Sequence, residues 1–259
     1  MACYERAAFC GTVSGIIAVT LLTGCMSPET QIREIDAQAD PVLKQMCSTL
    51  DQAKAFRLRV NATMDRPVDT GQLAQFHRTS ELTFVWPDRL YAETSSDDGH
   101  WVAWYRGKTL TILDKDSNAY ATEAVPDRID KMLDYLVDEY DLVMPMADLL
   151  VGETYSSLLA NVESGTYLGL HTVGDVKCHH LLYRQENLDW QIWIDAGKQP
   201  LPRKMVITYT QEPDQPQYVA TMDDWDLHPS LSEETFKFTP PTGAKSVTMS
   251  DLIEDKDEE

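Results

Sequence analysis

The strongest constraint on the fold is a strict two-residue alternation of apolar and polar residues from Phe56 to Asp65. In an extended chain successive side chains point to opposite faces, so this segment has one apolar and one polar face. That pattern is typical of an antiparallel strand with one side against a core. The apolar positions are Phe56, Leu58, Val60, Ala62 and Met64, and the polar ones are Arg57, Arg59, Asn61, Thr63 and Asp65.

Short segments of similar character follow at regular spacing, with Gly, Asp and Asn between them. Such a series predicts strands that pair in antiparallel order. Gly174-Asp175, between two apolar runs, predicts a two-residue hairpin turn. The pattern therefore predicts a mainly β (α+β) domain with one sheet of roughly ten strands. Beyond 56–65, the expected strands are 81–86, 89–95, 100–106, 108–114, 118–124, 166–173, 176–184, 189–195, 202–210, 217–227 and a short edge strand, 236–241.

Helices are expected before the sheet and in its middle. Asp40 is a good N-cap and Pro41 suits the first helical position. A longer amphipathic stripe predicts an inserted helix over 129–140, and shorter helical pieces are expected at 146–151 and 155–160. The apolar faces are Val42, Leu43, Met46, Cys47 and Leu50 in the first helix, and Ile129, Met132, Leu133, Leu136, Val137 and Tyr140 in the second.

The first 25 residues predict a bacterial lipoprotein signal. The apolar run 7–22 is shorter than the roughly 20 residues that span a bilayer, and it is typical of a secretory signal. Leu22-Thr23-Gly24-Cys25 resembles a lipobox, in which cleavage precedes the cysteine and its thiol receives a diacylglycerol. Met26 stands where inner-membrane retention signals have aspartate, which implies a periplasm-facing outer-membrane lipoprotein of a Gram-negative bacterium. An ordinary cleaved signal is the alternative.

The expected organisation is a signal peptide over 1–24, a lipidated tether over 25–39, one domain over 40–249 and an acidic tail over 250–259. The formal net charge of −20 disfavours binding to nucleic acid or to anionic headgroups. Membrane attachment is therefore expected through the lipid on Cys25 and not through a basic patch.

The stretch VKCHHLLYR, 176–184, raises the question of catalysis or metal binding. On a strand Cys178 and His180 share one face and His179 takes the other. With His171 across the hairpin, a two-ligand metal half-site is conceivable, but no histidine shows the short paired spacing of a zinc site. A nucleophilic Cys178 needs an oriented base, whereas its apolar neighbours predict a buried, inert thiol. We therefore predict no catalytic residue, no metal and no cofactor.

Cys47 and Cys178 are the two cysteines left after signal cleavage and acylation of Cys25. In an oxidising compartment they either form a disulfide or remain buried thiols. The sequence leaves both alternatives open.

Six motifs follow one another along the chain: YRGKTLTIL (105–113), MPMADLL (144–150), YLGLHTVGDVKCHHLLYR (167–184), DWQIWID (189–195), PLPRKMVITYT (200–210) and ATMDDWDLHPSLSEETFKFTPP (220–241). Together they resemble DUF2092, a bacterial family of predicted periplasmic proteins, over roughly residues 40–245. The resemblance implies the fold of the lipoprotein carriers LolA and LolB. In those proteins a curved antiparallel sheet forms an incomplete barrel, is covered by helices and holds acyl chains between sheet and helices. No motif carries over their individual functional residues.

An incomplete barrel of this kind either encloses an apolar cavity or closes into a dry core. We expect a protein that binds or hands over a hydrophobic ligand, either a lipid or an acylated protein. The alternatives are an envelope interaction protein with a filled core and, as a third class, a metal-dependent hydrolase. The residues expected to line the cavity are Phe56, Leu58, Val60, Met64, Leu133, Leu136, Trp190, Ile192 and Ile194.

Overall fold

The computed structural model of this protein describes residues 34–150 and 152–254, and its main feature is one thirteen-stranded sheet. The strands run in the spatial order β1-β8-β9-β10-β11-β12-β2-β3-β4-β5-β6-β7-β13. Their bounds are β1 Glu34–Ile35, β2 Ala55–Pro67, β3 Leu73–Val85, β4 Arg89–Ser96, β5 Gly99–Arg106, β6 Thr109–Asp114, β7 Ala119–Ala124, β8 Ser164–Val173, β9 Val176–Arg184, β10 Asp189–Asp195, β11 Pro202–Thr208, β12 Gln217–Asp226 and β13 Lys245–Ser246.

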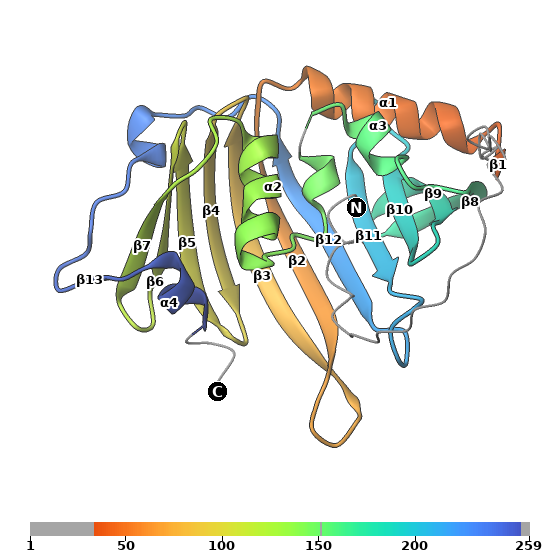
Figure 1. Ribbon diagram of the computed structural model, residues 1–259. Coiled ribbons are helices and arrows are strands. Elements are labelled where there is room, and N and C mark those ends of the chain that lie inside the picture. Colours follow the sequence, from red (N-terminus) through yellow and green to blue (C-terminus); the bar gives the residue numbers. More distant parts are fainter. Residues whose placement is uncertain (1–33, 151, 255–259) are drawn as a thin grey trace, which may run out of the picture.

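The sheet is curved and unclosed (Figure 1), because its two end strands, β1 and β13, each pair only inward. β1 pairs with β8 and β13 with β7, both in parallel, while the eleven strands between them pair in antiparallel order. The predicted mainly β class with an unclosed sheet is confirmed. The sheet has thirteen strands, more than the roughly ten expected, because eleven of the strands expected from the sequence form and the two-residue strands β1 and β13 are added at the edges.

Helices cover one face of the sheet, which we call the concave face (Figure 1). α1 (Ala39–Gln52) and α3 (Thr154–Leu158) lie together over the half that contains β8–β10, and α2 (Ile129–Tyr140) lies over the other half. The Tyr135 hydroxyl of α2 donates to Glu123 of β7 at 3.0 Å. The remaining helices are the 3-10 turns η2 (Ala147–Leu149) and η3 (Glu233–Phe236), and α4 (Met249–Glu254).

The predicted start of the first helix is off by two residues. α1 begins at Ala39, after Gln38, so Asp40 is inside the first turn and is not the N-cap. Its carboxylate instead binds Lys44, one turn later, and the Tyr155 hydroxyl of α3. Asp40 therefore joins the two helices that cover this half of the sheet.

Two predicted strands differ from those observed. β3 begins at Leu73, eight residues before the expected start at 81, because residues 73–80 continue the ladder opposite the far half of β2. Residues 236–241 form no strand: Phe236 ends η3, and the Phe238 ring packs 5.1 Å from the Trp104 ring, centroid to centroid. The prolines that follow lack the amide that a ladder needs, so aromatic packing fixes this segment instead.

The two described cysteines lie on opposite sides of the sheet. Cys47 belongs to the core between α1 and the concave face, where Leu181 and Tyr183 of β9 also lie. Cys178 is three residues from Leu181 on the same strand and therefore points to the other, convex face. Both thiols are free, which agrees with the buried-thiol alternative and not with the disulfide.

Packing extends beyond the expected domain limits of 40 and 249. β1 pairs within the stretch expected to be tether, and Ala39 is fully buried. At the other end, Met249 and Leu252 of α4 are buried, in a segment partly expected to be an acidic tail. The expected signal peptide lies outside the described residues.

Candidate functional site

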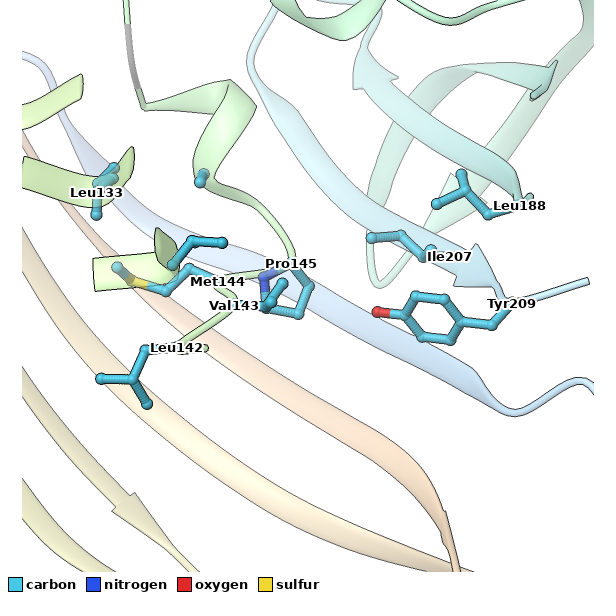
Figure 2. Close-up of a pocket in the computed structure, with 10 residues that line it drawn as sticks. Leu133, Leu142, Val143, Met144, Pro145, Leu188, Ile207 and Tyr209 are labelled. Atoms are coloured by element: carbon cyan, nitrogen blue, oxygen red, sulfur yellow. The ribbon is translucent and has the colours of Figure 1, made fainter. Parts of the chain in front are cut away.

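A short segment of residues 142–147, which we call the plug, crosses the concave face between α2 and η2. α2 ends at Tyr140, and its C-cap residue, Asp141, has a left-handed backbone with φ 53°. Pro145 then disfavours a continued helix, so the chain leaves α2 and passes over the sheet. Figure 2 shows Val143 and Pro145 centrally, with Leu133 of α2 on one side and Ile207 and Tyr209 on the other.

The first cavity lies between α2, the plug and β11, and we call it the α2 pocket. Its volume is about 30 Å³, room for a water-sized group or two. Its lining is almost wholly apolar. The residues are Leu133, Val137, Leu142, Val143, Met144, Pro145, Ala147, Leu188, Ile207 and Tyr209.

The second cavity lies on the other side of the plug, over the β2–β3 hairpin, and we call it the hairpin pocket. Its volume is about 140 Å³. It combines apolar side chains with charged ones. The lining residues are Ala62, Thr63, Met64, Arg66, Phe76, His77, Arg78, Asp98, Val143, Pro145, Tyr209 and Tyr218.

Three residues, Val143, Pro145 and Tyr209, line both pockets. The plug therefore forms the partition between them. Within the described chain, the backbone of 143–146 bonds only to the plug and η2, as in Ala147 N–H to the Met144 carbonyl at 3.0 Å. The backbone of 143–146 therefore makes no hydrogen bond to a described strand, and a segment without such bonds is among the less firmly held parts of a fold.

The floor of the hairpin pocket is set by the register of three strands. One cross-strand row contains Tyr218, Met64 and Phe76, and the next contains Ala220, Ala62 and Arg78. Residues opposite each other on neighbouring strands share a face. Of the two alanines in the second row, Ala62 lines the pocket, and its small side chain leaves a hollow beside the larger side chains of the first row.

Two arginines and one aspartate lie at the hairpin pocket. Arg66 is already paired: its Nη2 lies 2.7 Å from Asp98 Oδ2, and its guanidinium carbon lies 4.7 Å from the Phe76 ring centroid. Arg78 is exposed, and no hydrogen bond or ion pair joins its side chain to another described residue. Burial raises the pKa of Tyr218 to about 12, and the nearby Arg78 charge acts in the opposite direction. Tyr218 is thus a neutral hydroxyl next to a cation.

The nine residues predicted to line a cavity divide into two groups. Leu133 lines the α2 pocket and Met64 lines the hairpin pocket. The other seven pack in the closed core, where Trp190 is fully buried and its ring stacks 4.2 Å from Tyr183. These seven are Phe56, Leu58, Val60, Leu136, Trp190, Ile192 and Ile194.

The plug, Tyr209, Tyr218 and Arg78 were not predicted from the sequence. The available signal was Pro145 inside an apolar run after a helix. Ala62 is an ordinary strand residue in sequence, and only the register places it beside Arg78.

The histidines around Cys178 form a hydrogen-bonded pair on the convex face. His171 Nδ1 lies 2.9 Å from His180 Nδ1, and His180 Nε2 lies 3.0 Å from Gln191 Oε1. His180 also stacks on Trp193 at 3.8 Å, and burial lowers its pKa. His171 and His180, considered above as a metal half-site, thus contact each other across the hairpin. Within 34–150 and 152–254, no group of three or more His, Cys, Asp or Glu side chains could hold a metal ion.

Cys178 lacks the surroundings of a nucleophile. It is fully buried, and burial raises the pKa of its thiol to about 11. Its sulfur contacts the Val176 carbonyl at 3.5 Å, an acceptor that cannot remove a proton at neutral pH. A thiol in such a site is unreactive.

The expected anchor, Cys25, lies outside the described residues. Of the helices that the structure describes, none is long and apolar enough to cross a bilayer.

Several solved structures are similar to this chain at low sequence identity. An uncharacterised conserved protein from Thermus thermophilus has 9% identity and a TM-score of 0.47, covering 81% of this chain and 98% of its own. LprF from Mycobacterium bovis has 12% identity and a TM-score of 0.45, with the same coverages, 81% and 98%. A LolA superfamily protein from Nitrosomonas europaea has 9% identity and a TM-score of 0.38, covering 77% and 97%. No curated protein matches the chain.

The family model described as "predicted periplasmic protein (DUF2092)" matches residues 39–250. This range includes α1, almost all of the sheet, both pockets and the plug. The resemblance carried by the sequence motifs is thereby confirmed. The chain belongs to the DUF2092 family of predicted periplasmic proteins.

Proposed function

We propose that this protein binds the apolar chain of a hydrophobic ligand, a lipid or an acylated protein, on the concave face beneath the plug. One observation carries the proposal: Val143, Pro145 and Tyr209 line both pockets. Displacing the plug would join the pockets into one groove from the β2–β3 hairpin to α2. No catalytic step is assigned to this site.

The size of the pockets requires this movement. Their volumes of about 30 and about 140 Å³ are below the roughly 300–1,000 Å³ of sites for drug-sized ligands. We take the described conformation as the closed one. Each buried CH₂ group contributes about 0.8 kcal/mol, so burial of a chain of ten or more carbons offsets the displacement of a plug whose 143–146 backbone makes no hydrogen bond to a described strand.

Binding of dodecanol, a neutral single-chain probe, tests the proposal. The full chain carrying Cys25→Ser, which removes the expected acylation site, is titrated by calorimetry. We expect saturable one-to-one binding, weakened at least tenfold by Ala147→Phe, which fills the α2 pocket. Ala160→Phe, at an exposed position after α3, is the matched control. Absence of saturable binding, or equal effects of the two variants, would refute the site.

The proposed location is the periplasmic side of the outer membrane, with the lipid on Cys25 as the anchor. The support is the lipobox-like sequence together with the family description. Cys25→Ser should move the protein from the membrane fraction to the soluble periplasm. A Cys25→Ser protein that stays in the membrane fraction would contradict anchoring through a lipid on Cys25.

A second candidate function is docking of another envelope protein at the β8 edge. Among the described residues only β1 pairs with this edge, and only at Ser164 and Gly165. Leu168 and Leu170 of β8 are 40% and 46% exposed. The unpaired backbone groups of an open sheet edge can also accept a further strand. If the edge docks a partner, a photocrosslinker placed at Leu170 should give one discrete adduct in cells. A photocrosslinker placed at Thr172, further along β8, serves as the comparison. Absence of such an adduct leaves ligand binding as the one supported role.

A further inference from the structure

We propose that the ligand is a long-chain carboxylate, with its headgroup bound by Arg78 at the mouth of the hairpin pocket and its chain running under the plug toward α2. This inference rests on the proposed function and adds the class of ligand. The proposed ligand has one alkyl chain and one negative charge.

The position of Arg78 is fixed by strand pairing. Arg78 of β3 lies opposite Ala62 of β2, and Ala62 pairs in turn with Ala220 of β12. The guanidinium therefore rises from the same face as the hollow over Ala62, and it lines the pocket. A headgroup at Arg78 has an apolar floor directly beside it, which is the arrangement that an amphiphile requires.

The charge balance of the pocket favours an anion. The formally charged lining residues are Arg66, Arg78 and Asp98, and Arg66 pairs with Asp98 at 2.7 Å. One positive charge remains, in a chain whose formal net charge is −20. A guanidinium matches a carboxylate with two parallel hydrogen bonds, and a monoanion neutralises it without placing excess charge next to Asp98.

The neighbouring hydroxyl completes the headgroup site. Tyr218 lies one row from Arg78 on the same face, and it stays protonated at neutral pH because burial raises its pKa to about 12. Its O–H is available as a neutral donor to an oxyanion. Tyr209, which lines both pockets, then lies along the path of the chain.

The opposite end of the proposed path is apolar. The α2 pocket is lined by Leu133, Leu188 and Ile207 among others, and it presents no charged side chain. A ligand with a charged group at each end is therefore excluded, as is one that enters headgroup first. The polarity of the two pockets thus gives the ligand a direction.

The test compares three twelve-carbon probes on the full chain with Cys25→Ser: dodecanoate, dodecanol and dodecyltrimethylammonium. We expect dodecanoate to bind about five- to tenfold more tightly than dodecanol, and the cation to bind more weakly than both. Arg78→Gln should remove the advantage of dodecanoate, because it should weaken dodecanoate binding more than dodecanol binding. Arg57→Gln, the same charge change on the polar face of β2, is the control and should preserve the advantage.

The outcomes separate the two proposals. Equal affinity for dodecanoate and dodecanol, or an advantage that survives Arg78→Gln, would overturn the carboxylate assignment and leave the apolar site standing. Dodecyl phosphate is titrated as a fourth probe, and tighter binding of it than of dodecanoate would overturn the assignment in favour of a phosphate headgroup. If no probe binds, the proposed function fails and this inference fails with it.

Discussion

Ala62 and Arg78 are direct partners in the β2–β3 ladder, and both line the hairpin pocket on the concave face of the sheet. A small apolar side chain and an exposed cation thus lie side by side. Substitutions at these and neighbouring positions test this arrangement and the packing that surrounds it.

Filling the hollow at Ala62 should block the ligand. Ala62→Phe places a ring in a cavity of about 140 Å³, so we expect dodecanol affinity to fall at least tenfold. The cavity accepts much of the added volume, and the free energy of unfolding should fall by no more than about 1–3 kcal/mol. Calorimetric titration and urea unfolding give the two values. Ala55→Phe on the other face of β2 is the control, and an equal loss of affinity there would show that the hollow is not the binding site.

Gly165 should not tolerate a side chain. A Cβ at this position would lie 2.5 Å from Cε1 of the Tyr183 ring, which is fully buried and stacked on Trp190. Gly165→Ala is therefore expected to cost about 1–3 kcal/mol of unfolding free energy. In a double-mutant cycle with Tyr183→Leu the cost should shrink, since the clashing ring atoms are gone. Additive effects would show that the ring is not the cause.

The contribution of Glu93 to the free energy of unfolding should be lost at acid pH. Hydrogen bonds from Tyr91, Lys115 and His100 hold the pKa of Glu93 at about 2, well below the value of about 4.3 in an unfolded chain. The Glu93 contribution is thus complete above pH ~4.3 and is lost as pH falls toward 2. We expect Glu93→Gln to cost about 1 kcal/mol at pH 7, because the side chain is a third exposed.

Urea unfolding of the wild type and Glu93→Gln between pH 2 and pH 7 checks the direction of this pH dependence. The difference between the two proteins should be constant down to pH ~5 and then narrow. A difference that widens on acidification would mean that Glu93 is not stabilised as an anion.

The thiols of Cys47 and Cys178 should resist alkylation in the folded protein although they form no disulfide. Burial raises the pKa of Cys47 to about 12 and that of Cys178 to about 11, so almost no thiolate exists at pH 7. Iodoacetamide without a reductant should alkylate both residues only after denaturation, as read by peptide mass spectrometry. A cross-linked Cys47–Cys178 peptide would contradict the placement of the two cysteines on opposite faces of the sheet.

The strands and helices were largely predictable because local patterns encode them. The alternation from Phe56 to Asp65 defines β2, and the helical spacing from Ile129 to Tyr140 defines α2. Residues 73–80 escaped prediction because both faces of this part of β3 carry polar residues near the pocket. The feature that could have predicted the early start of β3 is the length of β2, since β2 needs a paired strand along its whole length.

The pocket was less predictable than the fold. The apolar strand face was expected to line a cavity, yet Trp190, Ile192 and Ile194 are fully buried in packed core. Which part of an apolar face stays open depends on where a crossing segment lies and on which rows carry alanine. Those are properties of register between strands more than a hundred residues apart, such as those of Ala62 and Ala220. No local pattern reports them.

The most direct measurement is a methyl NMR titration of the methionine side chains with dodecanol. Met64 lines the hairpin pocket and Met144 lines the α2 pocket, while Met46 is fully buried in the core under α1. We expect the Met64 and Met144 signals to shift together with one dissociation constant and the Met46 signal to stay in place. If dodecanol leaves both Met64 and Met144 unshifted, or moves Met46 as much as them, the ligand does not occupy a groove beneath the plug.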